Sequence, residues 1–187
     1  MTFTQVIGLC VLLAAYAAHA TDLLYEEDPA HFPEQNVLQL AGIGEQIFVR
    51  ERNFGETDYR CHSAKKKSRN PDGSYTYEFS VRNSTGDYIK WETTLTPATT
   101  GQHTEPNAVN YKFLLEGPEV QSKLMTVQPG DGCAVLVTVE SGNRVCMLLQ
   151  TASTVTGETI PQTCLGVYEN HCPRNGTDVE MWESGCQ

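Results

Sequence analysis

Stretches of alternating apolar and polar residues recur through most of this chain, and they constrain its fold more than any other feature. At 75–83, the sequence YTYEFSVRN places Tyr77 and Phe79 on one face and Glu78 on the other. A period of two residues is typical of a β-strand with one buried face. Similar stretches occupy 45–51, 58–63, 87–96, 110–116, 123–128, 133–139 and 144–152, about eight in all, separated by short turn sequences. The pattern predicts an all-β chain.

Two helical segments are expected beside the strands. The sequence FPEQNVLQLAGIG at 32–44 predicts a short helix that ends near Gly42 or Gly44. After the last strand, Pro161 can begin a second helix, because proline is favoured in the first turn. Pro173 would end that helix. The expected order is therefore a short N-terminal helix, the strands and a C-terminal helix.

A meander of about eight antiparallel strands has two edges, and closure into an up-and-down barrel removes them. A barrel of this size has room for its own side chains or for one small ligand. A sandwich of two sheets with a filled core satisfies the same periodicity. The alternation alone leaves both architectures open.

The first twenty residues have the features of a signal peptide, with an apolar run that ends in Ala18-His19-Ala20. We therefore predict a leader over 1–20, one domain over 21–187 and a secreted protein. Six cysteines remain after the leader: Cys61, Cys133, Cys146, Cys164, Cys172 and Cys186. An even set in a secreted chain predicts three disulfides, among about fifteen possible pairings. Two sequons predict glycans on Asn83 and Asn175.

The formal net charge of −10 argues against a nucleic-acid partner, which requires a basic surface. The one basic run, at 64–69, is expected to lie in a solvated hairpin loop. No stretch after the leader is long and apolar enough to predict a membrane span. The histidines stand in no recognised catalytic or metal-binding motif, so we expect no enzyme activity, no cofactor and no metal.

The stretch from Cys133 to Cys172 resembles the salivary lipocalins of ticks, the histamine-binding family. Its features are two cysteine-led strands joined by a hairpin, then a proline and a helix with spaced cysteines. The resemblance implies an eight-stranded antiparallel lipocalin barrel with the C-terminal helix packed outside. It also implies the disulfides Cys61–Cys186 and Cys133–Cys164, and Cys146–Cys172 is the pair that remains.

Family members that sequester biogenic amines share a signature of Cys-Asp-aliphatic, then Glu-Leu-Trp/Tyr, then Cys. Here Cys133, Val135, Leu148 and Cys164 match it. However, Ala134 and Met147 replace the two acids, and Leu149 replaces the aromatic residue. An ammonium group buried without a carboxylate costs several kcal/mol, whereas each buried CH₂ group contributes about 0.8 kcal/mol. This comparison favours an apolar ligand.

We predict that the ligand contacts the inward faces of the strands. The candidate residues are Phe48, Tyr77, Phe79, Ile89, Trp91, Tyr111, Phe113, Leu115, Met147 and Leu149. The chain is most similar to a sterol-binding branch of the family that acts on host dendritic cells. This likeness implies a ligand of cholesterol size, a host immune-cell receptor or protein as partner, and a monomer. Alternatives are a scavenger of amines or eicosanoids, with Glu45, Glu78 and Glu92 as candidate acids, and a complement-type protein inhibitor.

Overall fold

The computed structural model describes residues 23–55, 57–113, 116–157, 159–173 and 178–187. The expected leader, Leu115 and Asn175 lie outside these ranges. Two 3₁₀ helices (Tyr25–Glu27 and Pro29–Glu34) and the helix α1 (Val37–Gly42) precede the strands. The strands are β1 (Ile47–Arg52), β2 (Arg60–Arg69), β3 (Tyr75–Arg82), β4 (Tyr88–Ala98), β5 (Ala108–Lys112), β6 (Glu119–Gln128), β7 (Cys133–Glu140) and β8 (Asn143–Thr151). The helices α2 (Ala152–Val155) and α3 (Gln162–His171) and the short strand β9 (Val179–Glu180) follow.

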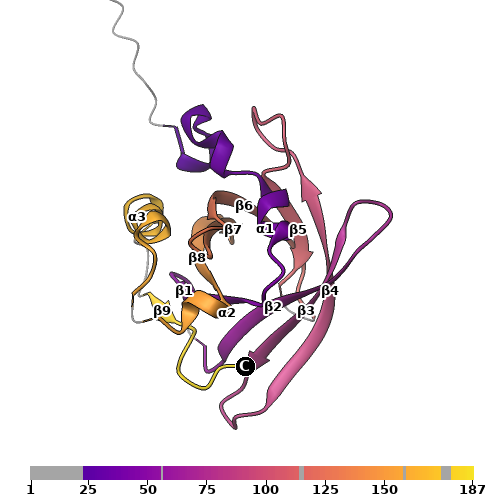
Figure 1. Cartoon of the computed structure of the whole chain (residues 1–187), viewed down its shortest axis with the longest axis vertical. Coiled ribbons are helices and arrows are strands. Elements are labelled where there is room, and N and C mark those ends of the chain that lie inside the picture. The colour runs from indigo at the N-terminus through magenta and orange to yellow at the C-terminus, as the bar shows by residue number, and fades with distance from the viewer. Residues whose placement is uncertain (1–22, 56, 114–115, 158, 174–177) are drawn as a thin grey trace, which may run out of the picture.

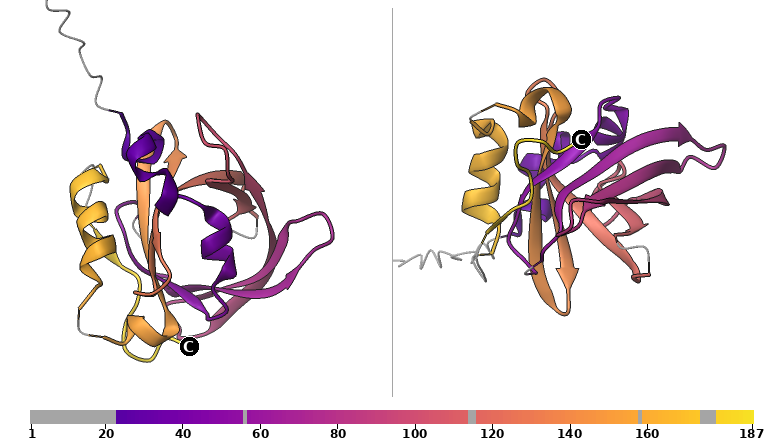
Figure 2. Two further views of the ribbon diagram at one scale, coloured as in Figure 1. Left: turned by 45° about the horizontal axis from the view of Figure 1, so that its top comes forward. Right: turned by 90° about the horizontal axis from the view of Figure 1, so that it is seen from below.

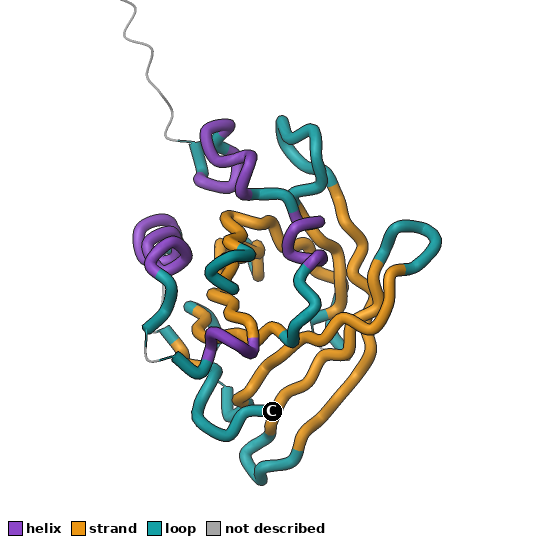
Figure 3. The backbone as a smooth tube through the Cα atoms, viewed as in Figure 1, coloured by secondary structure: helices purple, strands orange, loops and turns teal. Residues whose placement is uncertain are grey.

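The eight long strands close into an antiparallel barrel, as predicted. Strands β2 to β8 pair with their neighbours in chain order, and β1 pairs with both β8 and β2 to complete the ring (Figure 1). The pairing of β1 with β2 covers only Ile47 and Phe48, and β9 pairs with the far end of β1. Figure 3 shows the strands as a ring with α3 outside it. Because the strands form a closed ring, the chain is a barrel and not a sandwich of two sheets.

The stretch 146–149 shows how the two faces of the barrel wall differ. Met147 and Leu149 belong to the apolar cluster inside the barrel. Cys146 and Leu148 belong to a second cluster, which lies between the outer face of β6–β8 and the helix α3. Side chains alternate across a strand, so a wall that is covered on both sides is apolar at every position. The absence of charge in this stretch therefore reflects burial on two faces.

Three disulfides tie the outer layers to the barrel. They are Cys61–Cys186 and Cys133–Cys164, which the family resemblance implied, and Cys146–Cys172, the pair that then remained. Two of them attach α3 and its C-terminal end to β7 and β8. The third attaches the C-terminal end of the chain to β2.

The two ends of the barrel are covered differently. The short helix α1 begins after Asn36, whose side chain accepts a hydrogen bond from the Leu38 amide at 2.9 Å. A backbone bond of 2.9 Å from Val37 to Pro106 holds the helix at the β4–β5 connection. The connections β1–β2, β3–β4, β5–β6 and β7–β8 lie at the opposite end, because consecutive strands are antiparallel. We call this opposite end the mouth.

The basic run at 64–69 was expected in a loop, and that prediction is wrong. Residues 60–69 are all in β2, and the turn begins only at Asn70. The β2–β3 hairpin, purple in Figure 2, extends away from the ring. Its exposed lysines are tolerated in a strand because the projecting segment leaves one face in solvent.

Candidate functional site

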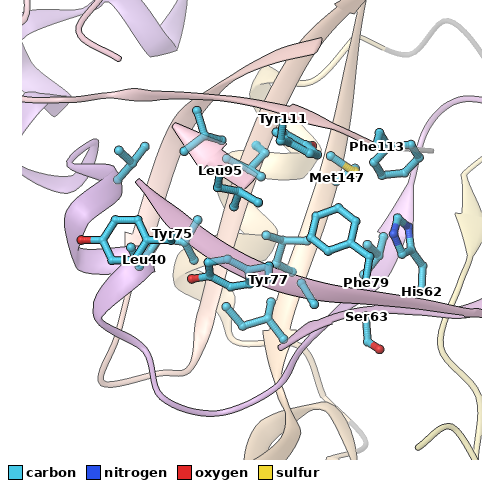
Figure 4. A pocket seen from close by; sticks show the side chains of 18 of the residues that line it. Leu40, His62, Ser63, Tyr75, Tyr77, Phe79, Leu95, Tyr111, Phe113 and Met147 are labelled. Atoms are coloured by element: carbon cyan, nitrogen blue, oxygen red, sulfur yellow. The ribbon is translucent and has the colours of Figure 1, made fainter. Parts of the chain in front are cut away.

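An apolar cavity of about 80 Å³ lies inside the barrel, and we call it the inner cavity. It is lined by Val37, Leu40, Ala41, Ile47, Val49, His62, Ser63, Ala64, Tyr75, Tyr77, Phe79, Leu95, Pro97, Val109, Tyr111, Phe113, Leu136, Met147 and Leu149. In Figure 4, Leu40 and Tyr75 stand at one end of it, and His62 and Phe113 stand at the other. The helix α1 covers the first end, and the second end faces the mouth.

No acidic or permanently charged side chain is among the described residues that line the inner cavity. Burial raises the pKa of both Tyr77 and Tyr111 to about 12, so each hydroxyl stays neutral. The Tyr111 hydroxyl lies 3.1 Å from the Ser122 Oγ, within hydrogen-bond distance. The wall is therefore uncharged, and its main attraction for a ligand is the removal of apolar surface from water.

The structure brings six of the ten predicted ligand residues together in this wall. They are Tyr77, Phe79, Tyr111, Phe113, Met147 and Leu149. Of the other four, Leu115 lies outside the described residues. Trp91 and Ile89 have the expected inward parity but line a second hollow at the mouth, and Ile89 is 39 % exposed there.

Phe48 does not line the inner cavity, in contrast to the prediction. Its neighbours Ile47 and Val49 line the cavity instead, and Phe48 is buried on the other face of β1. Three consecutive apolar residues carry no alternation, so periodicity could not choose the inward face. The pairing of Val49 with Leu149, which also lines the cavity, identifies it.

Several lining residues were not predicted from the sequence. Val37, Leu40 and Ala41 come from α1, whose position across one end of the ring depends on tertiary packing. Tyr75 and Leu95 share the inward parity of β3 and β4, so the alternation could have found them. His62 stands in a segment with weak alternation.

His62 separates the inner cavity from the mouth. Its ring lies edge-on to Phe113 at a centroid distance of 4.5 Å and edge-on to Phe79 at 5.7 Å. Burial, with a smaller effect from Arg52, lowers the pKa of His62 to about 3. The imidazole is therefore neutral at physiological pH. Within the part of the chain that the structure describes, neither ring nitrogen makes a hydrogen bond.

A second hollow, of about 440 Å³, lies at the mouth, and we call it the mouth hollow. It is lined by Arg52, Phe54, Gly55, Thr57, Tyr59, His62, Val81, Ile89, Trp91, Phe113, Glu140 and Met181. It shares His62 and Phe113 with the inner cavity, so the two spaces adjoin at this pair of rings. Among the described residues that line these two spaces, the acidic and permanently charged ones, Arg52 and Glu140, both belong to the mouth hollow.

The three acids considered for an amine site do not line either space. Glu78 lies between Lys67 and Lys90, at 3.0 and 3.9 Å. Glu45 accepts a hydrogen bond of 2.9 Å from the Ser153 amide, and Glu92 is exposed. Met147 and Ala134, which occupy the positions of the family's acids, both face the barrel interior. The described lining of the inner cavity therefore has no carboxylate for an ammonium group.

The family model for tick histamine-binding proteins matches residues 27–187. This chain belongs to that family. The match covers the barrel, α3 and the C-terminal segment. A comparison with curated protein sequences found no match.

Several solved structures of other proteins are similar to this chain, and they show that its fold is that of the lipocalins. Insecticyanin from the tobacco hornworm Manduca sexta has a TM-score of 0.60 and 13 % identity, covering 82 % of this chain and 86 % of its own. Japanin from Rhipicephalus appendiculatus, solved with bound cholesterol, has a TM-score of 0.55 and 14 % identity, covering 75 % and 95 %. Lobster apocrustacyanin A1 has a TM-score of 0.52 and 11 % identity, covering 87 % and 84 %. At these identities the likeness concerns the fold.

Two further observations concern other kinds of site. The described residues contain no group of three or more His, Cys, Asp or Glu side chains that could hold a metal ion. None of the helices in those residues is both long and apolar enough to cross a membrane.

Proposed function

We propose that this tick lipocalin carries one small hydrophobic ligand in its barrel and acts, after secretion, on the host immune response. The uncharged wall of the inner cavity is the observation that carries the proposal. Aliphatic and aromatic side chains from α1 and seven strands converge on this space. Burying an apolar ligand there contributes about 25 cal/mol per Å² of surface removed from water. The three disulfides are consistent with an extracellular protein.

Cholesterol is the reference ligand to test, because japanin was solved with cholesterol bound. The inner cavity of about 80 Å³ is smaller than the roughly 300–1,000 Å³ typical of ligand sites. A sterol would therefore occupy both the inner cavity and the mouth hollow, and the rings of His62 and Phe113 would have to separate. Dendritic cells are the host target that the family likeness suggests.

The first experiment identifies what the protein carries. Native mass spectrometry and organic extraction of the secreted protein should recover one apolar lipid per chain. Delipidated protein should take up labelled cholesterol or an acyl lipid. The variant Leu149→Trp, which fills the inner cavity, should bind at least tenfold more weakly, because its indole occupies the space.

Val139→Trp is the matched control, since Val139 is 65 % exposed and lines neither the inner cavity nor the mouth hollow. Its binding should equal that of the unmodified protein. Recovery of empty protein that ignores every added lipid would overturn the proposal. Submicromolar binding of histamine or serotonin by calorimetry would favour the amine scavenger instead. An immune effect that persists in Leu149→Trp would favour a protein-contact inhibitor.

A further inference from the structure

Three polar side chains with unused hydrogen-bonding groups meet at the mouth hollow. Arg52, His62 and Trp91 all line it, and each is more than nine-tenths buried, at 8, 3 and 8 % exposure. Buried polar groups in folded proteins are normally paired. A group of three that share one hollow indicates a missing partner in that hollow.

Arg52 is turned into the barrel by an irregularity in β1. The register shifts between Val49 and Glu51, so Glu51 lies opposite Leu148 and Arg52 lies opposite Met147. Paired residues of an antiparallel ladder share a face, and Met147 lines the inner cavity. The bulge therefore places a guanidinium, rather than a carboxylate, at the entrance of the apolar space.

The guanidinium of Arg52 makes no ion pair with a described acid. Burial lowers the pKa of Arg52, and the Glu140 carboxylate opposes this shift from beyond ion-pair distance. The Arg52 Nη2 donates a hydrogen bond of 3.1 Å to the Gly55 carbonyl, and its Nε is buried without a partner. It lies over the Phe54 ring at 4.9 Å. Arginine stays charged in proteins, and a buried charge is costly unless it is paired. A bound anion would provide that pairing.

Trp91 and His62 add hydrogen-bonding groups beside this charge. The Trp91 Nε1 is buried and has no hydrogen-bond partner. The rings of Trp91 and His62 lie 6.2 Å apart. Neutral imidazole carries one donor and one acceptor, so the pair can offer two donors to a single group of oxygen atoms.

A larger hollow of about 610 Å³ beside β6–β8 provides a contrast. Its Arg144 donates bonds of 3.0 and 2.7 Å to the Glu26 carboxylate, and its Lys123 pairs with Glu27. Both basic side chains in that lining are therefore paired with carboxylates of the protein. Among the described residues that line the mouth hollow, the only acid is the exposed Glu140, which makes no ion pair with a described residue.

We propose that the mouth hollow binds the carboxylate head of an acyl lipid whose hydrocarbon chain enters the inner cavity. Arg52 pairs with the carboxylate, and Trp91 and His62 hydrogen-bond to it. The inference rests on the proposed function, because the chain must first bind in the apolar cavity. A narrow cavity suits one flexible chain, a neutral sterol would leave Arg52 unpaired, and Arg52 would repel an amine.

The test compares three lipids that share one hydrocarbon chain: oleic acid, oleyl alcohol and oleylamine. Each displaces a neutral fluorescent lipid from the delipidated full-length protein at neutral pH. We expect oleate to bind at least about tenfold more tightly than the alcohol, with the amine weakest, because charge-assisted hydrogen bonds are the stronger kind. This series needs no variant, so it tests the proposal even if a substitution prevents folding.

Substitutions assign the preference to its residues. Arg52→Gln should remove the preference for oleate over the alcohol, while Trp91→Phe should weaken oleate binding about threefold. Arg50→Gln is the matched control on the same strand, because Arg50 pairs with Glu180 at 3.1 Å and lies over Trp182, away from both spaces. It should keep the preference for the acid.

The outcomes separate the two proposals. Equal binding of acid and alcohol, both lost in Leu149→Trp, would overturn the head-group assignment and leave the apolar carrier in place. Tighter binding of cholesterol than of oleate would likewise overturn the head-group assignment and leave the apolar carrier in place. Failure of all three lipids and of cholesterol would overturn both proposals.

Discussion

The inner cavity and the mouth hollow adjoin within one barrel, yet their chemistry is opposite. The first is a space of about 80 Å³ with no charged side chain among its described lining residues. The second is a space of about 440 Å³ lined by Arg52, His62, Trp91 and Glu140 as well as apolar residues. The comparison teaches that the two parts of a ligand meet different forces. If both proposals hold, apolar burial retains the body of the ligand, and charge at the mouth selects its head.

The two regions also differ in how the backbone builds them. The inner cavity comes from regular ladders, such as the unbroken pairing of β3 with β4. The mouth is formed where the pairing of neighbouring strands is interrupted. The β1 register shifts after Val49, the β2 register shifts between Arg60 and Ser63, and Cys61 has a φ of 56°. A non-glycine residue in this region costs about 1–3 kcal/mol, and the Cys61–Cys186 disulfide lies at that residue.

The largest effect is expected when a charge is placed in the inner cavity, because this removes its difference from the mouth hollow. Met147→Glu should abolish apolar lipid binding and lower the free energy of unfolding by about 4 kcal/mol at neutral pH, because the buried carboxyl must give up its charge. Urea unfolding and lipid displacement measure the two effects. Leu38→Glu, on the exposed face of α1, is the control and should change neither. Unchanged stability in Met147→Glu would mean that water reaches this wall.

The disulfides of the outer layer should affect stability without affecting ligand choice. Replacing both Cys133 and Cys164 by alanine should cost about 3–4 kcal/mol, since the bridge closes a loop with a sequence separation of 31 residues. Chemical unfolding measures the loss. The affinity ratio of oleate to oleyl alcohol should stay constant. A changed ratio would show that α3 contributes to the mouth.

The buried imidazole predicts a pH dependence for stability. The pKa of His62 is about 3 in the folded protein because of burial and Arg52, against 6.5 for an ordinary histidine. Between these values the unfolded chain binds a proton that the folded chain does not, so stability falls as pH falls below about 6.5. From pH 7 to pH 5 this histidine should account for a loss of about 2 kcal/mol.

His62→Phe should remove that share of the pH dependence, because phenylalanine can keep the contacts with Phe79 and Phe113 without titrating. Urea unfolding of both proteins at pH 7 and pH 5 gives the comparison, and the other titrating groups cancel between them. Parallel pH profiles for the two proteins would show that His62 is solvated.

The smallest effect is expected for a substitution of Glu140 in the lining of the mouth hollow. Glu140→Gln should strengthen oleate binding about twofold at low salt by removing a like charge, and the gain should disappear at high salt. Binding of oleyl alcohol should not change. A gain in oleate affinity that persists at high salt would show that Glu140 contacts the ligand directly and does not act through long-range charge repulsion.

Strand periodicity located much of the cavity wall but not its limits. Tyr77, Phe79, Tyr111, Met147 and Leu149 line the cavity because alternation carries each face through a regular ladder. Alternation was uninformative at 47–49, where three apolar residues are adjacent and Phe48 was placed on the wrong face. The alternation also could not show that Ile89 lies beyond the end of the cavity. How far each strand is offset from its neighbours is decided only when the barrel closes.

By itself, the sequence determined the all-β architecture, the order of helices and strands, and an uncharged wall at Ala134, Met147 and Leu149. These features are local or follow from residue type. Only the tertiary structure decided that α1 closes one end, that a bulge turns Arg52 inward, and that His62 and Trp91 meet it at the mouth. Such contacts join residues far apart in the chain, and their register depends on the closure of the whole barrel.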